Sequence, residues 1–142
     1  MDTRALHTLI ERYVEAWKQR DPAVLGSFHT VDGVVESPMY ATRCGRPSIE
    51  EAYRAFLTSF PDATQATNAT VVEPPHIALF TTVTATHMNE FFGLPGTGRH
   101  VEFRLCQLIE VRDGLMAHVR RVYDFTGLLL QVGVLRAKPA KP

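Results

Sequence analysis

The sequence predicts an α+β fold in which a curved antiparallel sheet wraps around N-terminal helices to form an open cone with an internal cavity. Two observations lead to this prediction. Apolar residues recur at helical spacing through much of the first 60 positions, and from about position 63 they alternate with a period of two. Helices followed by a run of antiparallel strands are typical of α+β proteins. A sheet that curves around helices leaves a concave space suited to a small molecule.

The first helix is predicted from a single apolar stripe. Asp2 or Thr3 can cap its N-terminus, and the Arg-Asp-Pro segment at 20–22 ends it. The stripe follows the i, i+3, i+4, i+7 spacing of one helix face. It consists of Leu6, Leu9, Ile10, Tyr13, Val14 and Trp17.

Two further helices and a strand are predicted before residue 62. A short helix covers residues 23–28, and residues 31–40 form a strand that breaks at a proline. In the next helix Ser48 and Glu51 stand at capping-box spacing, and Pro61 ends the helix.

The rest of the chain predicts four strands and a last short helix. The strands cover residues 63–73, 76–87, 100–111 and 115–124. A loop at 88–99, rich in Gly and Pro, separates the two strand pairs, and a helix at 125–133 ends at Gly133. Residues 1–134 therefore form one domain, and residues 135–142 form a polar C-terminal tail.

The composition excludes several classes of protein. Fifteen Lys and Arg balance fifteen Asp and Glu, which argues against a nucleic-acid partner. No apolar run reaches the ~18 residues of a membrane span, and the N-terminus lacks a signal-peptide core, so we expect no membrane partner and a cytoplasmic protein. Six histidines are scattered without i, i+4 pairs, so no metal site is predicted. Cys44 and Cys106 are expected to be free thiols.

The hairpin around Asp113 decides which charged residues face the cavity. A two-residue loop places Gln107 opposite Arg120, whereas a three-residue loop places Leu105 opposite Arg121. A one-residue slip turns every side chain to the other face, and only the three-residue loop separates apolar from charged residues. We therefore expect Arg121 to point inward, with Gln107 and Tyr123 as its nearest polar neighbours.

Several segments occur in an order that resembles the SnoaL-like polyketide and ester cyclases of the nuclear-transport-factor-like superfamily. The segments are "FPD", "TH", "FFGLPGTGR", "VRDG" and "YDFTGLLLQVG". The resemblance extends from the first helix to Gly133 and implies an α+β cone that works without a metal or cofactor. The characterised cyclases close a polyketide ring by an intramolecular aldol condensation.

The resemblance also implies which positions carry the family's chemistry. An aspartate on the last strand acts as the base in those cyclases, and a Gln-x-His pair on the neighbouring strand assists it. Here the aspartate position holds Arg121, and the pair falls at Leu105 and Gln107. Asp124 matches a second family aspartate, which we interpret as a helix cap rather than a base. The family's aldol base is therefore missing.

A buried guanidinium needs a partner, because its desolvation costs several kcal/mol. Two alternatives remain open for Arg121. It forms an internal ion pair with Glu36, Asp62 or Glu90, or it binds an anionic ligand. His87 matches a family histidine that either takes part in the chemistry or anchors the following loop.

Two functions from different classes are compatible with these residues. The first is a cofactor-free enzyme acting on a small, mostly apolar carbonyl or ester compound, of cyclase, isomerase, dehydratase or hydrolase type. The second is a non-catalytic cone that binds a small organic acid. The candidate catalytic residues are His87, Gln107 and Arg121. The candidate ligand-pocket residues are Tyr13, Trp17, Leu105, Val119, Tyr123, Phe91 and Phe92.

Two expectations concern the surface. The outer sheet face should form a homodimer, because apolar residues lie between its charges, namely Cys106, Leu108, Met116 and Val122. The loop at 88–99 should border the mouth of the cavity with Phe91 and Phe92 as a lid, because long loops in compact domains are often functional.

Overall fold

The computed structural model describes residues 1–138, and the last four residues of the predicted tail lie outside this range. The helices are α1 (Thr3–Ala16), the short 3-10 helix η1 (Trp17–Gln19), α2 (Pro22–Gly26), α3 (Arg46–Ser59) and α4 (Phe125–Val132). The strands are β1 (His29–Glu36), β2 (Arg43–Cys44), β3 (Thr64–Glu73), β4 (His76–Thr86), β5 (His100–Arg112) and β6 (Leu115–Val122). The α+β class and the order of helices before strands are as predicted.

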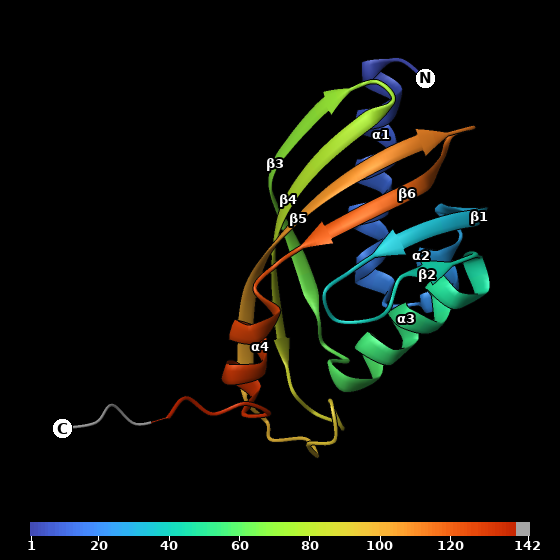
Figure 1. Cartoon of the computed structure of the whole chain (residues 1–142). Coiled ribbons are helices and arrows are strands. Elements are labelled where there is room, and N and C mark those ends of the chain that lie inside the picture. The colour runs from blue at the N-terminus through green and yellow to red at the C-terminus, as the bar shows by residue number, and fades with distance from the viewer. Residues whose placement is uncertain (139–142) are drawn as a thin grey trace.

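The six strands form one curved, unclosed sheet in the order β2-β1-β6-β5-β4-β3. The helices α1 and α3 lie against its concave face, and α4 follows β6 at one end (Figure 1). One feature differs from the predicted antiparallel sheet, because β1 pairs with β6 in parallel. The short strand β2 was not predicted, since two residues carry no periodicity.

The helix caps were predicted with mixed success. Asp2 caps α1 and accepts a hydrogen bond from the backbone N–H of Ala5 at 2.8 Å. The predicted capping box of α3 is wrong, because the helix begins at Arg46 and its cap is Gly45, without a side-chain bond. Ser48 therefore lies inside the first turn, where its side chain cannot act as the cap.

The β5–β6 hairpin has a two-residue turn, so the predicted three-residue loop is wrong. Asp113 and Gly114 both have positive φ, 53° and 76°, as a type I′ turn requires. The register then shifts by one residue between Glu110 and Val111, and beyond this bulge Gln107 pairs with Arg121. The bulge leaves one extra residue, Ala117, unpaired in β6, and this restores the predicted inward direction of Arg121.

The bulge explains why the predicted faces hold for most of β6 but fail at its start. The observed partner of Arg121 lies two residues from the predicted one, and a shift of two keeps a side chain on the same face. Before the bulge the faces are reversed. Met116, predicted on the outer face, is only 1% exposed and packs in the core.

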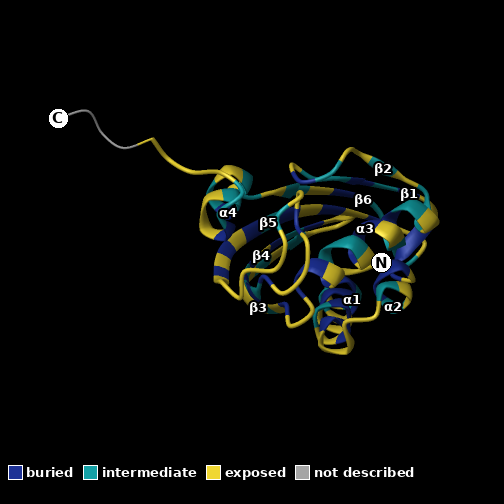
Figure 2. Cartoon of the chain, turned by 90° about the horizontal axis from the view of Figure 1, so that it is seen from below, coloured by how far each residue is buried: buried dark blue, intermediate teal, exposed yellow. Residues whose placement is uncertain are grey.

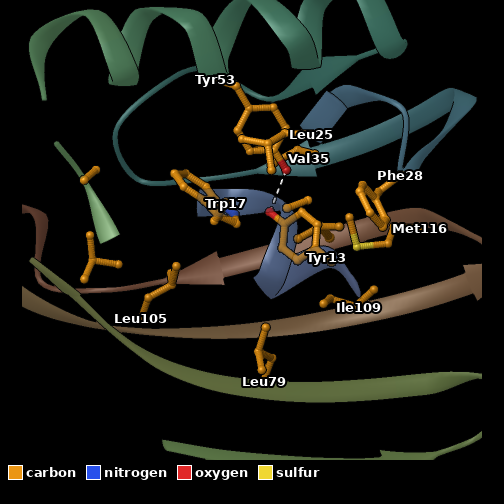
Figure 3. Close-up of a cluster of buried hydrophobic side chains, with 14 of the residues drawn as sticks. Tyr13, Trp17, Leu25, Phe28, Val35, Tyr53, Leu79, Leu105, Ile109 and Met116 are labelled. Carbon is orange, nitrogen blue, oxygen red and sulfur yellow. Dashed lines mark hydrogen bonds between the residues drawn. The ribbon is translucent and has the colours of Figure 1, made fainter. Parts of the chain in front are cut away.

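The core fills the space between the helices and the concave face of the sheet. Figure 2 shows the buried residues of α1, α3 and the strands facing one another, with exposed residues outside. Figure 3 shows Tyr13 of α1 above Leu79 and Ile109 of the sheet. None of the helices between residues 1 and 138 combines the length and apolarity that a membrane crossing requires. Cys44 and Cys106 are both free.

Helix α4 is attached to the strand β5 by side-chain hydrogen bonds. The Gln131 amide accepts from the backbone N–H of Glu102 at 2.8 Å and donates to its carbonyl at 2.9 Å. Arg99, at the end of the loop 88–99, donates to the carbonyl of Val132 at 3.3 Å. Asp124 caps α4 by accepting from the N–H of Gly127 at 2.8 Å, as predicted. These contacts fix the helix at the end of the sheet.

Candidate functional site

A cavity lies between α3 and the concave face of the sheet. The atoms around it leave about 510 Å³ of empty space, open solvent at its mouth included. Aromatic side chains make much of its wall, namely Trp17, Tyr40, Tyr53, Phe56, Phe103 and Tyr123. The cavity therefore offers a small, mostly apolar space, the usual character of a small-molecule site.

Arg121 brings a positive charge to this wall. Its Nε donates to Oε1 of Gln107 at 3.0 Å, and its Nη2 donates to the hydroxyl of Tyr53 at 2.9 Å. The guanidinium carbon also lies 5.2 Å from the centre of the Tyr53 ring. A guanidinium has five N–H donors, so these two bonds leave further donors for a ligand. Both partners are neutral and hold the guanidinium in place without cancelling its charge.

Tyr53 connects Arg121 to two further buried side chains. Its hydroxyl lies 2.7 Å from the hydroxyl of Tyr13 and 2.7 Å from Nε2 of His29 (the bond to Tyr13 is drawn in Figure 3). A phenol has one proton to donate and two lone pairs, so three partners use its full capacity. Tyr53 thus positions Arg121 and has no remaining bond for a ligand.

The buried groups around Arg121 stay neutral. Burial lowers the pKa of His29 to about 3, helped by the nearby charges of Arg121 and Arg46. Burial likewise raises the pKa of Tyr53 well above its usual value, with Tyr13 adding to the effect and Arg121 opposing it. Arg121 is therefore the one permanent charge in this cluster of four side chains, Tyr13, His29, Tyr53 and Arg121.

The other two phenols on the wall are also protonated at neutral pH. Burial raises the pKa of Tyr40 to about 12, and it raises that of Tyr123 as well, against the hydrogen bond from Ser37. The hydroxyl of Tyr123 lies 2.8 Å from that of Ser37. Because these phenols are protonated at neutral pH, they can donate a hydrogen bond to an oxyanion but cannot accept a proton as bases.

The internal ion pair, one of the two alternatives left open for Arg121, does not form among the residues that the structure describes. Within residues 1–138 no carboxylate lies within 4.0 Å of its guanidinium. Glu36 lies instead beside His118 and Arg120, at 2.6 and 3.1 Å. The other two candidates also lie elsewhere: Asp62 accepts from the N–H of Thr86, and Glu90 is exposed. The sequence could not exclude these acids, because their placement depends on the curvature of the sheet.

The structure brings some of the predicted pocket residues to the wall. Trp17, Leu105, Arg121 and Tyr123 line the cavity. Gln107 is buried and touches it only through Arg121. Tyr13 and Val119 do not line the cavity, since both belong to the core behind it.

His87 does not reach the cavity. It is fully buried, and its Nδ1 accepts from the N–H of Thr97 at 3.3 Å and lies 2.9 Å from the Thr97 hydroxyl. Its ring packs against Phe60 and Phe91. The structure thus places His87 as an anchor of the loop 88–99.

The loop 88–99 approaches the cavity through one aromatic contact. Phe91 is buried under the loop, whereas Phe92 is 50% exposed. The ring of Phe92 stacks on Tyr40, a wall residue, at a centroid distance of 6.3 Å. Neither phenylalanine lines the cavity itself. The loop therefore contacts the wall residue Tyr40 and does not face the cavity through Phe91 or Phe92.

Several wall residues were missed by sequence reasoning. Ser37, Met39 and Tyr40 follow β1 in a segment that the sequence predicted only as a broken strand. Tyr53 belongs to the buried apolar stripe of α3, and nothing in the spacing of that stripe shows which member faces a void. The signal available was the hydroxyl itself, since a buried Tyr usually finds a hydrogen-bond partner.

Comparisons with known proteins agree with this architecture. The family model described as "SnoaL-like polyketide cyclase" matches residues 7–132. The chain belongs to the SnoaL-like polyketide cyclase family. None of the curated proteins matches this sequence closely enough to count as a relative.

Solved structures of this family and fold superpose well on the chain. AclR of Streptomyces galilaeus, a proposed hydroxylase, is 27% identical, with a TM-score of 0.80 over 94% of this chain and 87% of its own. IdmH of Streptomyces antibioticus, a proposed polyketide cyclase, is 25% identical, with a TM-score of 0.76 over 89% and 97%. A protein of Catenulispora acidiphila with a ketosteroid isomerase-like fold is 16% identical, with a TM-score of 0.74 over 88% and 92%. That last likeness concerns the fold alone.

Proposed function

We propose that this SnoaL-like protein is a cofactor-free enzyme that acts on a small, mostly apolar carbonyl or ester compound and stabilises negative charge on its oxygen with Arg121. The observation that carries the proposal is a cation at a cavity wall whose partners within residues 1–138 are neutral. A buried cation costs several kcal/mol of desolvation. An anionic ligand, or an oxyanion that forms during the reaction, would offset that cost.

The wall also limits the chemistry. Among the described residues it contains no Asp, Glu or His, so no side chain there can act as the family's aldol base. Arg121 can stabilise an enolate or a tetrahedral oxyanion as charge develops, and Tyr40 or Tyr123 can donate a hydrogen bond to the same oxygen. A water molecule then has to accept the proton that leaves the substrate C–H or the attacking water. The fitting substrate is one whose C–H is already acidic, or an ester that water attacks.

The same wall favours a second candidate, a non-catalytic cone that binds a small organic acid. A binder needs the cation and the apolar space but no group that moves a proton. The two functions therefore share a binding site and differ only in turnover.

Titration calorimetry with benzoate and its neutral analogue benzamide tests the site. We expect benzoate to bind more tightly, and its affinity to fall in Arg121→Met by about 1.5–3 kcal/mol, the value of a hydrogen bond to a charged group. This is about 10- to 160-fold. The matched control is Arg120→Met, because Arg120 is the next residue on the same strand, 60% exposed and on the outer face. Equal affinities in both variants would contradict the proposal.

Turnover separates the enzyme from the binder. Nuclear magnetic resonance in deuterium oxide follows exchange of the α-protons of ethyl benzoylacetate, a β-keto ester with an acidic C–H, and absorbance follows hydrolysis of phenyl acetate. The enzyme should accelerate at least one of these reactions, and Arg121→Met should remove the acceleration. Benzoate binding at Arg121 without acceleration of either reaction would favour the binder.

A further inference from the structure

Two polar atoms on the cavity wall have no hydrogen-bond partner within residues 1–138. They are Nε1 of Trp17 and Oε1 of Gln65, and both are buried. Trp17 is only 5% exposed, so its N–H has little access to solvent. A buried polar group without a partner costs about 1–3 kcal/mol. Two such groups on one cavity wall indicate a place where a ligand supplies the missing bonds.

These two atoms lie on the side of the cavity away from Arg121. Gln65 is on β3, at one edge of the sheet, and η1 with Trp17 contacts that strand. Arg121 is on β6, three strands further along the sheet. The ring of Tyr53 contacts both sides, 5.8 Å from the Trp17 ring and 5.2 Å from the guanidinium carbon. One aromatic ring therefore bridges the distance between the two polar sides.

The chemistry of the two atoms identifies the ligand group that fits them. The indole N–H only donates, and the amide oxygen only accepts. A hydroxyl satisfies both at once, because it accepts from the indole and donates to the amide. A carbonyl could satisfy Trp17 alone, and a methyl group could satisfy neither.

We propose that the cavity binds a small hydroxylated aromatic acid, with its carboxylate at Arg121 and its hydroxyl between Trp17 and Gln65. The contact between the carboxylate and Arg121 rests on the proposed function. The contact of the hydroxyl with Trp17 and Gln65 is the new part of the proposal. The rings of Phe56, Phe103 and Tyr123 give a flat ring aromatic neighbours.

Calorimetry with benzoate and the three hydroxybenzoate isomers tests the inference on the full chain. We expect at least one isomer to bind about tenfold more tightly than benzoate, the effect of about 1.4 kcal/mol from the added hydrogen bonds. Trp17→Phe keeps an aromatic ring and removes the N–H, and Gln65→Leu removes the acceptor. Each variant should lose the gain from the hydroxyl, measured as the ratio of hydroxybenzoate affinity to benzoate affinity within that variant. Gln19→Leu, an exposed glutamine of η1, is the control and should keep the gain.

The outcomes separate this inference from the proposed function. Benzoate that binds through Arg121, with no isomer binding more tightly, would refute the hydroxyl site alone. A gain that survives in both Trp17→Phe and Gln65→Leu would refute it too. Benzoate that binds equally to the parent and to Arg121→Met would instead refute the proposed function. Thermal melts identify a variant that fails to fold, and the other variant then decides the outcome.

Discussion

Replacing Arg121 by Met should leave the protein folded and close to its original stability. The variant removes two hydrogen bonds to a charged group, about 1.5–3 kcal/mol each, and also removes a buried charge whose desolvation costs several kcal/mol. These terms are similar in size and opposite in sign. We therefore expect the free energy of unfolding to change by about 2 kcal/mol or less. Urea unfolding followed by circular dichroism measures it.

Gln107 provides an internal check on this reasoning. Its amide N–H already lacks a partner, and in Arg121→Met its oxygen loses one as well. The double variant with Gln107→Leu removes this unpaired amide and should be more stable than Arg121→Met. A loss of about 3–5 kcal/mol in Arg121→Met is the size expected when a buried partner charge is stranded. That result would mean that Arg121 belongs to an ion pair and would refute the ligand interpretation.

Three further predictions concern other parts of the molecule. His29 should destabilise the fold below pH 6.5, because the unfolded chain binds a proton there that the folded chain does not bind until about pH 3. Relative to His29→Gln, the free energy of unfolding of the parent should fall by up to about 1.4 kcal/mol for each pH unit in this window. The control His76→Gln changes an exposed histidine and should behave like the parent. Asp124→Ala should cost about 1 kcal/mol through the lost cap of α4, and an unchanged melting temperature would contradict this. Light scattering should show a homodimer at micromolar concentration. The variant Val122→Asp should be a monomer, because Val122 lies on the outer sheet face and is 67% exposed. A parent protein that is monomeric would contradict the predicted dimer.

The elements with strong periodicity were predictable from the sequence. The stripe of α1 and the alternation in β3 to β6 come from side chains that must face the core, so the pattern and the fold have the same cause. The start of α3, the parallel pairing of β1 with β6 and the bulge at the start of β6 were not predictable. Each depends on contacts with distant segments, which the spacing of apolar residues within one segment does not reveal.

The site was only partly predictable for a related reason. Alternation along β6 predicted that Arg121 faces inward, because a charge on the core face stands out among apolar neighbours. Tyr13 and Trp17 were both predicted as pocket residues, and only the packed structure shows that Trp17 lines the cavity whereas Tyr13 does not. The same holds for Tyr53, which the spacing of α3 does not distinguish from its apolar neighbours. Gln65 lies on an edge strand of mostly exposed residues, so its buried oxygen gave no signal in the sequence.

The residues that reveal the family differ from those that line the cavity, and the structure gives the reason. Gln131 pairs with the backbone of β5, Arg99 reaches the end of α4, and Asp124 caps that helix. These side chains of the "FFGLPGTGR" and "YDFTGLLLQVG" segments hold the end of the cone together. The cavity wall takes most of its residues from outside these two segments, from α3, the strands and the segment after β1, and Tyr123 is the exception. A scaffold built in this way can keep its shape while the residues of the cavity wall change. Family membership therefore predicts the fold of this chain, and its reaction has to be found from Arg121 and its neighbours.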